Sequence, residues 1–220
     1  MLADNRLLNF VKSLLNPEEL GMAVPAHVRD EARAILGRDT VENDAKGNDW
    51  IQTYTGQKLF PLNPKFEDIK IEDIAHSLSL KCRFGGHSIC HYGVSQHSVL
   101  VSENVPEQYA LCALMHDSSE YALCDLASPI KCHFPNFARA ELKLMKVIAK
   151  KFGFVWPEPL CVKRADRILL NTERRDLMFN PGNESWGLEN YPPLKKAIIP
   201  WTWQEAEERF LDRFHEVKNW

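Results

Sequence analysis

Four histidine and aspartate side chains from three separate points of the chain could together bind one divalent metal ion. His116 and Asp117 are adjacent and close the apolar run from Leu111 to Met115. Adjacent side chains on a helix point about 100° apart, so both can still reach one ion. His97 and Asp166 each lie at helical spacing from apolar residues, which points them inward. Because an ionised carboxylate on an apolar face needs a cation or a donor, these four residues are the predicted metal ligands.

Each of these residues also has an ordinary interpretation. A single histidine on an apolar face is more often a hydrogen-bonded core residue, and this applies to His97. Asp166 lies between Arg164 and Arg167 and could form a surface ion pair. The coincidence of all four favours the metal site. Mixed nitrogen and oxygen ligation suits one Mn, Co, Zn or Fe ion, in preference to Mg.

Helices must position these side chains, and the sequence predicts an all-α bundle with one short β-hairpin. Residues 50–60 contain β-formers on either side of Thr55-Gly56, which predicts the hairpin. Five or more helices with almost no strand signal indicate the helical bundle. The expected helices start at Ile71, span 93–104, open at Pro106, and span 137–152, 159–179 and 202–217.

The first 49 residues are expected to form an N-terminal extension. Helical periodicity is present at 5–15 and 25–36, and the segment 37–48 is polar and suited to a loop. We therefore predict two parts, an extension over 1–49 and a domain over 50–220.

Composition excludes several classes of protein. The 220 residues carry a formal net charge of −3, which argues against stable nucleic-acid binding through bulk electrostatics. No apolar run approaches the roughly 20 residues of a membrane span. Six cysteines are present without a C-x-x-C pair or a secretory segment. We expect reduced thiols and a cytoplasmic protein.

The order His97, His116-Asp117, Asp166 resembles the H…HD…D signature of the HD-domain superfamily of metal-dependent phosphohydrolases. Residues 116–131, HDSSEYALCDLASPIK, are similar to the corresponding stretch of bacterial 5′-deoxynucleotidases and phage deoxynucleoside triphosphohydrolases. Residues 82–97 are also similar, with an arginine a turn or more ahead of the first metal histidine. The resemblance covers roughly residues 50–217 and implies an HD-domain helical bundle.

The resemblance implies catalytic roles for two carboxylates. Glu120 follows Asp117 by one turn and would orient water or shuttle a proton. Asp125 would be the second catalytic carboxylate. The ordinary alternatives are a solvated carboxylate at a helix end for Glu120 and a helix N-cap for Asp125.

Five residues are candidates for substrate binding. Arg83 is the expected phosphate clamp, because a guanidinium can meet phosphate oxygens in a bidentate way. His87 follows two glycines and could also reach phosphate. Lys131 and Lys163 are candidate phosphate partners, with ordinary surface lysines as the alternative. Phe84 could stack on sugar or base and stands where the related families often carry Trp.

The expected function is a metal-dependent 5′-deoxynucleotidase that releases phosphate from deoxynucleoside monophosphates. The alternative is a deoxynucleoside triphosphohydrolase that releases tripolyphosphate, for which the two lysines would suit the longer anion. More remote alternatives are a di-iron HD oxygenase, which needs additional ligands, and an inactive nucleotide sensor. The expected partner is a small-molecule nucleotide, and a homo-oligomer is expected by analogy alone.

Overall fold

The computed structural model describes Phe10, Val28, residues 49–179 and residues 186–218. The contacts within the chain divide it between Asn48 and Asp49, and the fold described below is that of the second unit. The two helices expected at 5–15 and 25–36, and the loop at 37–48, lie outside the described residues apart from the two isolated positions. The assignment of a separate extension therefore stays a prediction.

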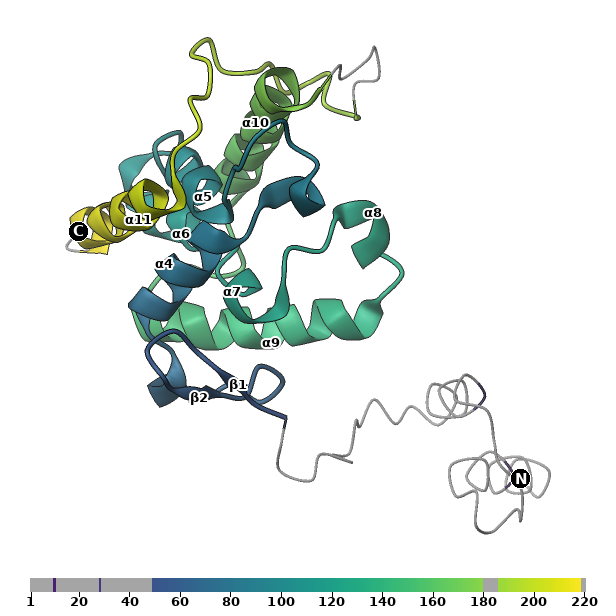
Figure 1. Cartoon of the computed structure of the whole chain (residues 1–220), viewed down its shortest axis with the longest axis vertical. Helices are drawn as coiled ribbons and strands as arrows, with labels where there is room; N and C mark the ends of the chain where they lie inside the picture. The colour runs from purple at the N-terminus through teal and green to yellow at the C-terminus, as the bar shows by residue number, and fades with distance from the viewer. Residues whose placement is uncertain (1–9, 11–27, 29–48, 180–185, 219–220) are drawn as a thin grey trace. The chain divides into compact units, whose positions relative to one another are not determined.

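A small hairpin opens the second unit, as the sequence predicts. Strand β1 (Ile51–Gln52) pairs antiparallel with β2 (Lys58–Leu59). Gly56 has a φ of +80°, a conformation that glycine adopts without steric cost and that the turn requires. Thr55 donates from its backbone N and its Oγ1 to the carboxylate of Asp73, at 2.7 and 3.0 Å. These two hydrogen bonds fasten the hairpin to helix α4 (Ile71–Leu80), beside which it lies in Figure 1.

The remainder of the described chain is almost entirely helical, which confirms an all-α bundle carrying a two-stranded hairpin. The α-helices are α4 (Ile71–Leu80), α5 (Val94–Ser102), α6 (Ala110–Leu114), α7 (Glu120–Leu123), α8 (Ser128–Lys131), α9 (Pro135–Phe152), α10 (Leu160–Leu177) and α11 (Trp203–Lys218). Three 3₁₀ turns join them: η1 (Phe66–Asp68), η2 (Arg83–Gly86) and η3 (Glu107–Tyr109).

Helix α5 lies at the centre of the bundle and contacts α4, α6, α10 and α11 (Figure 1). A larger apolar cluster joins α4, α9 and α11, with Leu78, Ile148 and Phe210 fully buried in it. A smaller cluster packs α10 against α5 and α6 through Leu169 and Val101. The smaller cluster holds α5 and α10 side by side, and these two helices carry His97 and Asp166.

The segment from Pro106 to α7 differs from the expected third helix. Pro106 precedes the 3₁₀ turn η3 instead of opening an α-helix, and α6 ends at Leu114. His116 and Asp117 therefore lie in tight turns between α6 and α7, where Ser118 N donates to Met115 O and Glu120 N to Asp117 O. Apolar periodicity detects the buried face here but cannot distinguish an α-helix from successive three-residue turns.

A short loop returns the chain from α4 to α5 and carries η2. Cys82 and Gly93 form an isolated antiparallel bridge at its base. A Cβ at Gly93 would lie 2.9 Å from the carbonyl oxygen of Ser79, so the close approach of these backbones requires glycine. The bridge fixes Arg83 at the start of η2 and His97 one turn into α5.

All six cysteines are free. Among the helices that the structure describes, none has the length and apolar character that a membrane span requires.

Candidate active site

Three side chains from separate elements form a group that could hold a metal ion. His97 of α5, His116 after α6 and Asp166 of α10 place their ligand atoms within 4.8 Å of one another. The Nε2 atom of His97 lies 3.3 Å from Nε2 of His116 and 3.3 Å from Oδ1 of Asp166. Residues 69 positions apart in the chain thus meet at one point inside the bundle.

The fourth expected ligand, Asp117, lies at the edge of this group. Its Oδ2 is 3.2 Å from Nε2 of His116 and 3.7 Å from Nε2 of His97. The compact three-residue group does not include it, so its role as a ligand stays a proposal. Asp117 and Asp166 remain 24% and 34% exposed whereas His97 is fully buried, so the group opens to solvent on its carboxylate side.

Hydrogen bonds to the other ring nitrogens fix both histidine rings. The backbone oxygen of Ala113 accepts from Nδ1 of His116 at 2.7 Å. Oε1 of Glu173 lies 2.6 Å from Nδ1 of His97. A carboxylate can only accept, so Nδ1 of His97 donates. Both rings therefore direct Nε2 at the group, which is the arrangement that metal-binding histidines show.

Glu173 was not predicted from the sequence. It is fully buried, and it also accepts hydrogen bonds from Tyr92 Oη at 2.9 Å and from Arg83 Nη2 at 3.0 Å. Burial raises its pKa, but Arg83 and His97 hold that pKa below the ordinary value. Its spacing of seven residues from Asp166, two helical turns, was the signal available in the sequence.

The donor set fits a divalent ion, because two imidazole nitrogens and at least one carboxylate oxygen converge. The pKa shifts of His116 and Asp166 indicate that this group of side chains favours bound positive charge. Burial lowers the pKa of His116, yet Asp117 and Asp166 raise it to about 9. Burial raises the pKa of Asp166, but the two histidines hold it below the ordinary value. Protons on the histidines and a metal ion compete for these same atoms.

The two expected catalytic carboxylates lie close to this group. Glu120 begins α7 and is 5% exposed. Burial, Asp117 and Asp125 together raise the pKa of Glu120 well above its ordinary value. Burial also raises the pKa of Asp125. Cys124 between them has a φ of +95°, which a non-glycine residue rarely adopts and which turns the chain from α7 toward Asp125.

Arg83 lies beside the group, although its donors are partly used within the protein. Its Nη2 pairs with Glu173 and its Nη1 lies 3.6 Å from Oδ2 of Asp117. Within the described residues, its buried Nε has no hydrogen-bond partner. The neighbouring Phe84 has a φ of +57°, and its ring centroid is 6.2 Å from that of Trp186. Trp186 is the second residue near the site that the sequence did not indicate.

The other three expected substrate residues are less well placed. Lys131 pairs with Oε1 of Glu141 at 2.8 Å. Lys163 is exposed and lies 3.8 Å from Oε1 of Glu158. His87 is exposed at the end of η2. Lys131 also interacts electrostatically with Asp117 and Glu120, which help to raise its pKa, but no hydrogen bond or ion pair between described residues joins these three side chains to the histidine and aspartate group.

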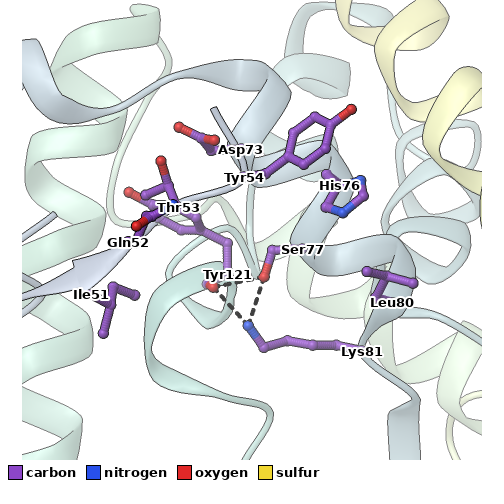
Figure 2. A pocket seen from close by; sticks show the side chains of 10 residues that line it. All are labelled: Ile51, Gln52, Thr53, Tyr54, Asp73, His76, Ser77, Leu80, Lys81 and Tyr121. Atoms are coloured by element: carbon purple, nitrogen blue, oxygen red, sulfur yellow. Dashed lines mark hydrogen bonds between the residues drawn. The ribbon is translucent and has the colours of Figure 1, made fainter. Parts of the chain in front are cut away.

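A separate cavity of about 400 Å³ lies between the hairpin, α4 and Tyr121 (Figure 2). Hydrogen bonds at one wall of this cavity hold α7 in place. The carbonyl oxygen of Tyr121 accepts from Ser77 Oγ and from Lys81 Nζ, each at 2.7 Å, and Lys81 Nζ also donates to Ser77 Oγ at 2.8 Å. Tyr54 covers His76 by stacking, with ring centroids 3.7 Å apart. Because Tyr121 follows Glu120, this cavity wall also positions Glu120.

Comparison with known proteins finds relatives over most of the chain, although no family model matches it. The uncharacterized protein YfdR of Escherichia coli K12 is 39% identical over 169 residues, which cover 76% of this chain and 95% of that protein. An uncharacterized protein of Rhodobacter capsulatus is 32% identical over 142 residues, covering 58% of this chain and 72% of that protein.

A 5′-deoxynucleotidase of Photorhabdus temperata is 32% identical over 103 residues, or 47% of this chain and 50% of that enzyme. The corresponding enzyme of Photorhabdus laumondii is 29% identical over the same length. This partial similarity supports an HD-domain-like relationship. The chain therefore belongs to the family of E. coli YfdR, which it matches over nearly the whole of that protein.

Proposed function

We propose that this protein is a metal-dependent phosphohydrolase that releases phosphate from deoxynucleoside 5′-monophosphates. The observation that carries the proposal is the convergence of His97, His116 and Asp166, with two carboxylates of raised pKa beside them. The partial similarity to 5′-deoxynucleotidases supports a phosphohydrolase and a nucleotide substrate.

His97, His116, Asp166 and Asp117 would hold one divalent ion of the Mn, Co, Zn or Fe type. The ion would supply Lewis-acid activation of a phosphate oxygen and of water. The exposed side of the group, at Asp117 and Asp166, is where a phosphate would enter. An opening of this kind is typical of catalytic sites rather than of closed structural ones.

Glu120 is the proposed general acid or base. Burial, Asp117 and Asp125 raise the pKa of Glu120, so this carboxyl holds a proton more readily than an exposed glutamate and can donate it to a reacting group. Within the part of the chain that the structure describes, its buried Oε2 has no hydrogen-bond partner. Asp125 is the proposed second carboxylate. Ala127, not Asp125, is the N-cap residue of α8, so the ordinary capping interpretation does not account for Asp125.

Arg83 is the proposed phosphate contact through Nη1, which lies beside the metal group at 3.6 Å from Oδ2 of Asp117, beyond ordinary hydrogen-bond distance. Phe84, which follows Arg83 directly, and Trp186, which contacts Phe84, offer aromatic surfaces on which a base or sugar could stack. The ion pairs of Lys131 with Glu141 and of Lys163 with Glu158 reduce the positive charge that a triphosphate would need. We therefore favour a monophosphate over a triphosphate as substrate.

The test is phosphate release from a panel of deoxynucleoside and ribonucleoside monophosphates, with Mn²⁺ or Co²⁺. A His116→Gln variant serves as the blank. We expect metal-dependent release from at least one deoxynucleoside monophosphate and none from the variant. Absence of release across the panel, or equal release by the variant, contradicts the proposal. Product chromatography with deoxynucleoside triphosphates separates the alternative, since only a triphosphohydrolase yields tripolyphosphate.

A further inference from the structure

Glu173 is a buried carboxylate that lies outside the expected ligand and catalytic sets. It belongs to α10, two helical turns after Asp166, and so lies on the same face of that helix. It is fully buried, as is the Tyr92 that donates to it. An ionised carboxylate at such a position is costly to bury unless its oxygens are fully partnered.

We propose that Glu173 is a positioning residue that couples the metal ligand His97 to the phosphate contact Arg83. Its Oε1 accepts hydrogen bonds from His97 and Tyr92, and its Oε2 accepts a hydrogen bond from Arg83. The part that concerns Arg83 rests on the proposed function, whereas the part that concerns His97 requires only that the site binds metal.

The contact with His97 selects one form of the ring. Imidazole carries its single neutral-state proton on either nitrogen, and only the form with the proton on Nδ1 presents a lone pair at Nε2. A carboxylate 2.6 Å from Nδ1 holds the proton there and fixes the ring plane. Removal of such a partner from a metal-binding histidine weakens metal binding roughly 10- to 100-fold.

The contact with Arg83 fixes the guanidinium. With Nη2 held by Glu173 and Nη1 facing Asp117, the plane of the group is fixed from one side. The Nη1 group, which at 3.6 Å from Asp117 lies beyond ordinary hydrogen-bond distance, then has a fixed direction. A phosphate contact prepared in this way loses less side-chain freedom on binding than a free arginine would.

Two substitutions separate the two contacts. In Glu173→Gln the amide oxygen can still accept from His97 and Tyr92, but the amide nitrogen then faces Nη2 of Arg83 as a second donor. The flipped amide could accept from Arg83 and donate to Tyr92, but it would place its NH2 group against the Nδ1–H of a His97 that binds metal through Nε2. Metal binding therefore selects the first orientation. Glu173→Ala removes both contacts. Asp176→Asn is the matched control: Asp176 lies on α10, pairs with Arg175 and accepts from Ile198 N, away from the site.

The experiment measures Mn²⁺ affinity of the metal-free full chain by electron paramagnetic resonance, which counts free Mn²⁺ and needs no enzymatic turnover. Circular dichroism and thermal melts confirm that each variant is folded. We expect Glu173→Ala to weaken Mn²⁺ binding roughly 10- to 100-fold, Glu173→Gln to stay within about threefold of wild type, and Asp176→Asn to be unchanged. Unaltered Mn²⁺ affinity in folded Glu173→Ala overturns the inference, and so does a loss in Glu173→Gln as large as in Glu173→Ala.

Steady-state kinetics on the best deoxynucleoside monophosphate test the Arg83 contact. We expect Glu173→Gln at saturating Mn²⁺ to raise KM roughly tenfold with a smaller change in kcat, matching Arg83→Gln in direction, because a charge-assisted hydrogen bond is lost. An unchanged KM in Glu173→Gln overturns the inference that Glu173 couples His97 to Arg83. If Glu173→Ala does not fold, this KM measurement on Glu173→Gln decides whether the inference holds. If Glu173→Ala weakens Mn²⁺ binding and Glu173→Gln does not, but the wild-type protein hydrolyses no nucleotide, only the proposed function is refuted. Failure of wild type to bind Mn²⁺ refutes both.

Discussion

The two sides of the candidate site differ in how completely the protein satisfies their polar groups. On the ligand side, His97 and His116 are buried and each has its Nδ1 held, by Glu173 and by the carbonyl of Ala113. On the carboxylate side, Glu120 is also buried, yet within the described residues its Oε2 has no partner. Burial alone therefore does not distinguish the two sides.

This difference in hydrogen-bond partners separates the groups whose positions the fold fixes from the groups that have room for a partner from a ligand. A network that is fully partnered within the chain holds its geometry before anything binds. Glu120, a buried carboxylate of raised pKa whose Oε2 has no partner among the described residues, is the group that we propose for proton transfer. We therefore expect substitutions on the ligand side to abolish metal binding. Substitutions on the carboxylate side should reduce turnover while leaving metal binding intact and without lowering the stability of the fold.

The largest effect is expected from His116→Gln. Metal activation supplies several kcal/mol of transition-state stabilisation, and about 1.4 kcal/mol corresponds to tenfold in rate. We expect turnover to fall roughly 10³-fold or more, with loss of bound Mn²⁺ in metal analysis. His133→Gln is the control, because His133 is exposed. Similar losses in both variants would contradict the assigned ligand set.

The next largest effect is expected from Glu120→Gln, which removes the titrating group but keeps the size of the side chain. We expect kcat to fall roughly 10²- to 10⁴-fold, as for loss of a general acid or base. Mn²⁺ affinity should stay at the wild-type value. The exposed Glu208→Gln should leave both quantities unchanged. Undiminished kcat in Glu120→Gln would remove Glu120 from the chemistry.

The same substitution is expected to stabilise the protein in a pH-dependent way. The folded-state pKa of Glu120 is raised well above its ordinary value, chiefly by burial. The folded state then holds the proton more tightly than the unfolded state, so its stability falls as pH rises above the ordinary glutamate value of about 4.3.

Because glutamine does not titrate, the Glu120→Gln variant does not lose stability in this way as pH rises. Melting temperatures in the presence of a chelator should show Glu120→Gln above wild type, with a gap that widens from about pH 4.3 upward. One kcal/mol corresponds to about 2–4 °C for a chain of this size. A gap that is constant or that narrows with rising pH would show that Glu120 is not destabilised by its charge.

The smallest effect is expected from Lys81→Met, at the cavity wall shown in Figure 2. Lys81 supports the carbonyl of Tyr121, but Ser77 also donates to that oxygen and would remain. We expect a loss of about 1 kcal/mol in the free energy of unfolding, measured by urea denaturation, and a kcat within about tenfold of wild type. Lys195→Met, at an exposed position, is the control. A larger loss of kcat than in Glu120→Gln would place Lys81 in the chemistry itself.

Most of the fold was predictable because its signals are local. Apolar periodicity placed α4, α5, α9, α10 and α11 to within a few residues, and the Thr55-Gly56 turn placed the hairpin. The turns around His116 were not predictable, since the inward-facing pattern of three-residue turns imitates that of a helix. The convergence of His97, His116 and Asp166 was predicted, because each residue interrupts an apolar face.

Glu173 escaped the sequence interpretation because its meaning depends on partners far along the chain. It lies 76 residues from His97 and 90 from Arg83, and its seven-residue spacing from Asp166 does not by itself distinguish it from a solvent-exposed helix glutamate. Lys131 and Lys163 illustrate the converse case. Lysines near a phosphate site attract notice in a sequence, but the structure pairs them with Glu141 and Glu158. Spatial partners, which a single sequence does not show, decide both cases.

The most direct test of the metal centre is a crystal structure of the Mn²⁺-soaked protein with an anomalous difference map. We expect one strong peak bound by Nε2 of His97, Nε2 of His116 and carboxylate oxygens of Asp166 and Asp117, with Glu173 still holding Nδ1 of His97. Absence of a peak at that point, or a peak bound by other side chains, would contradict the account.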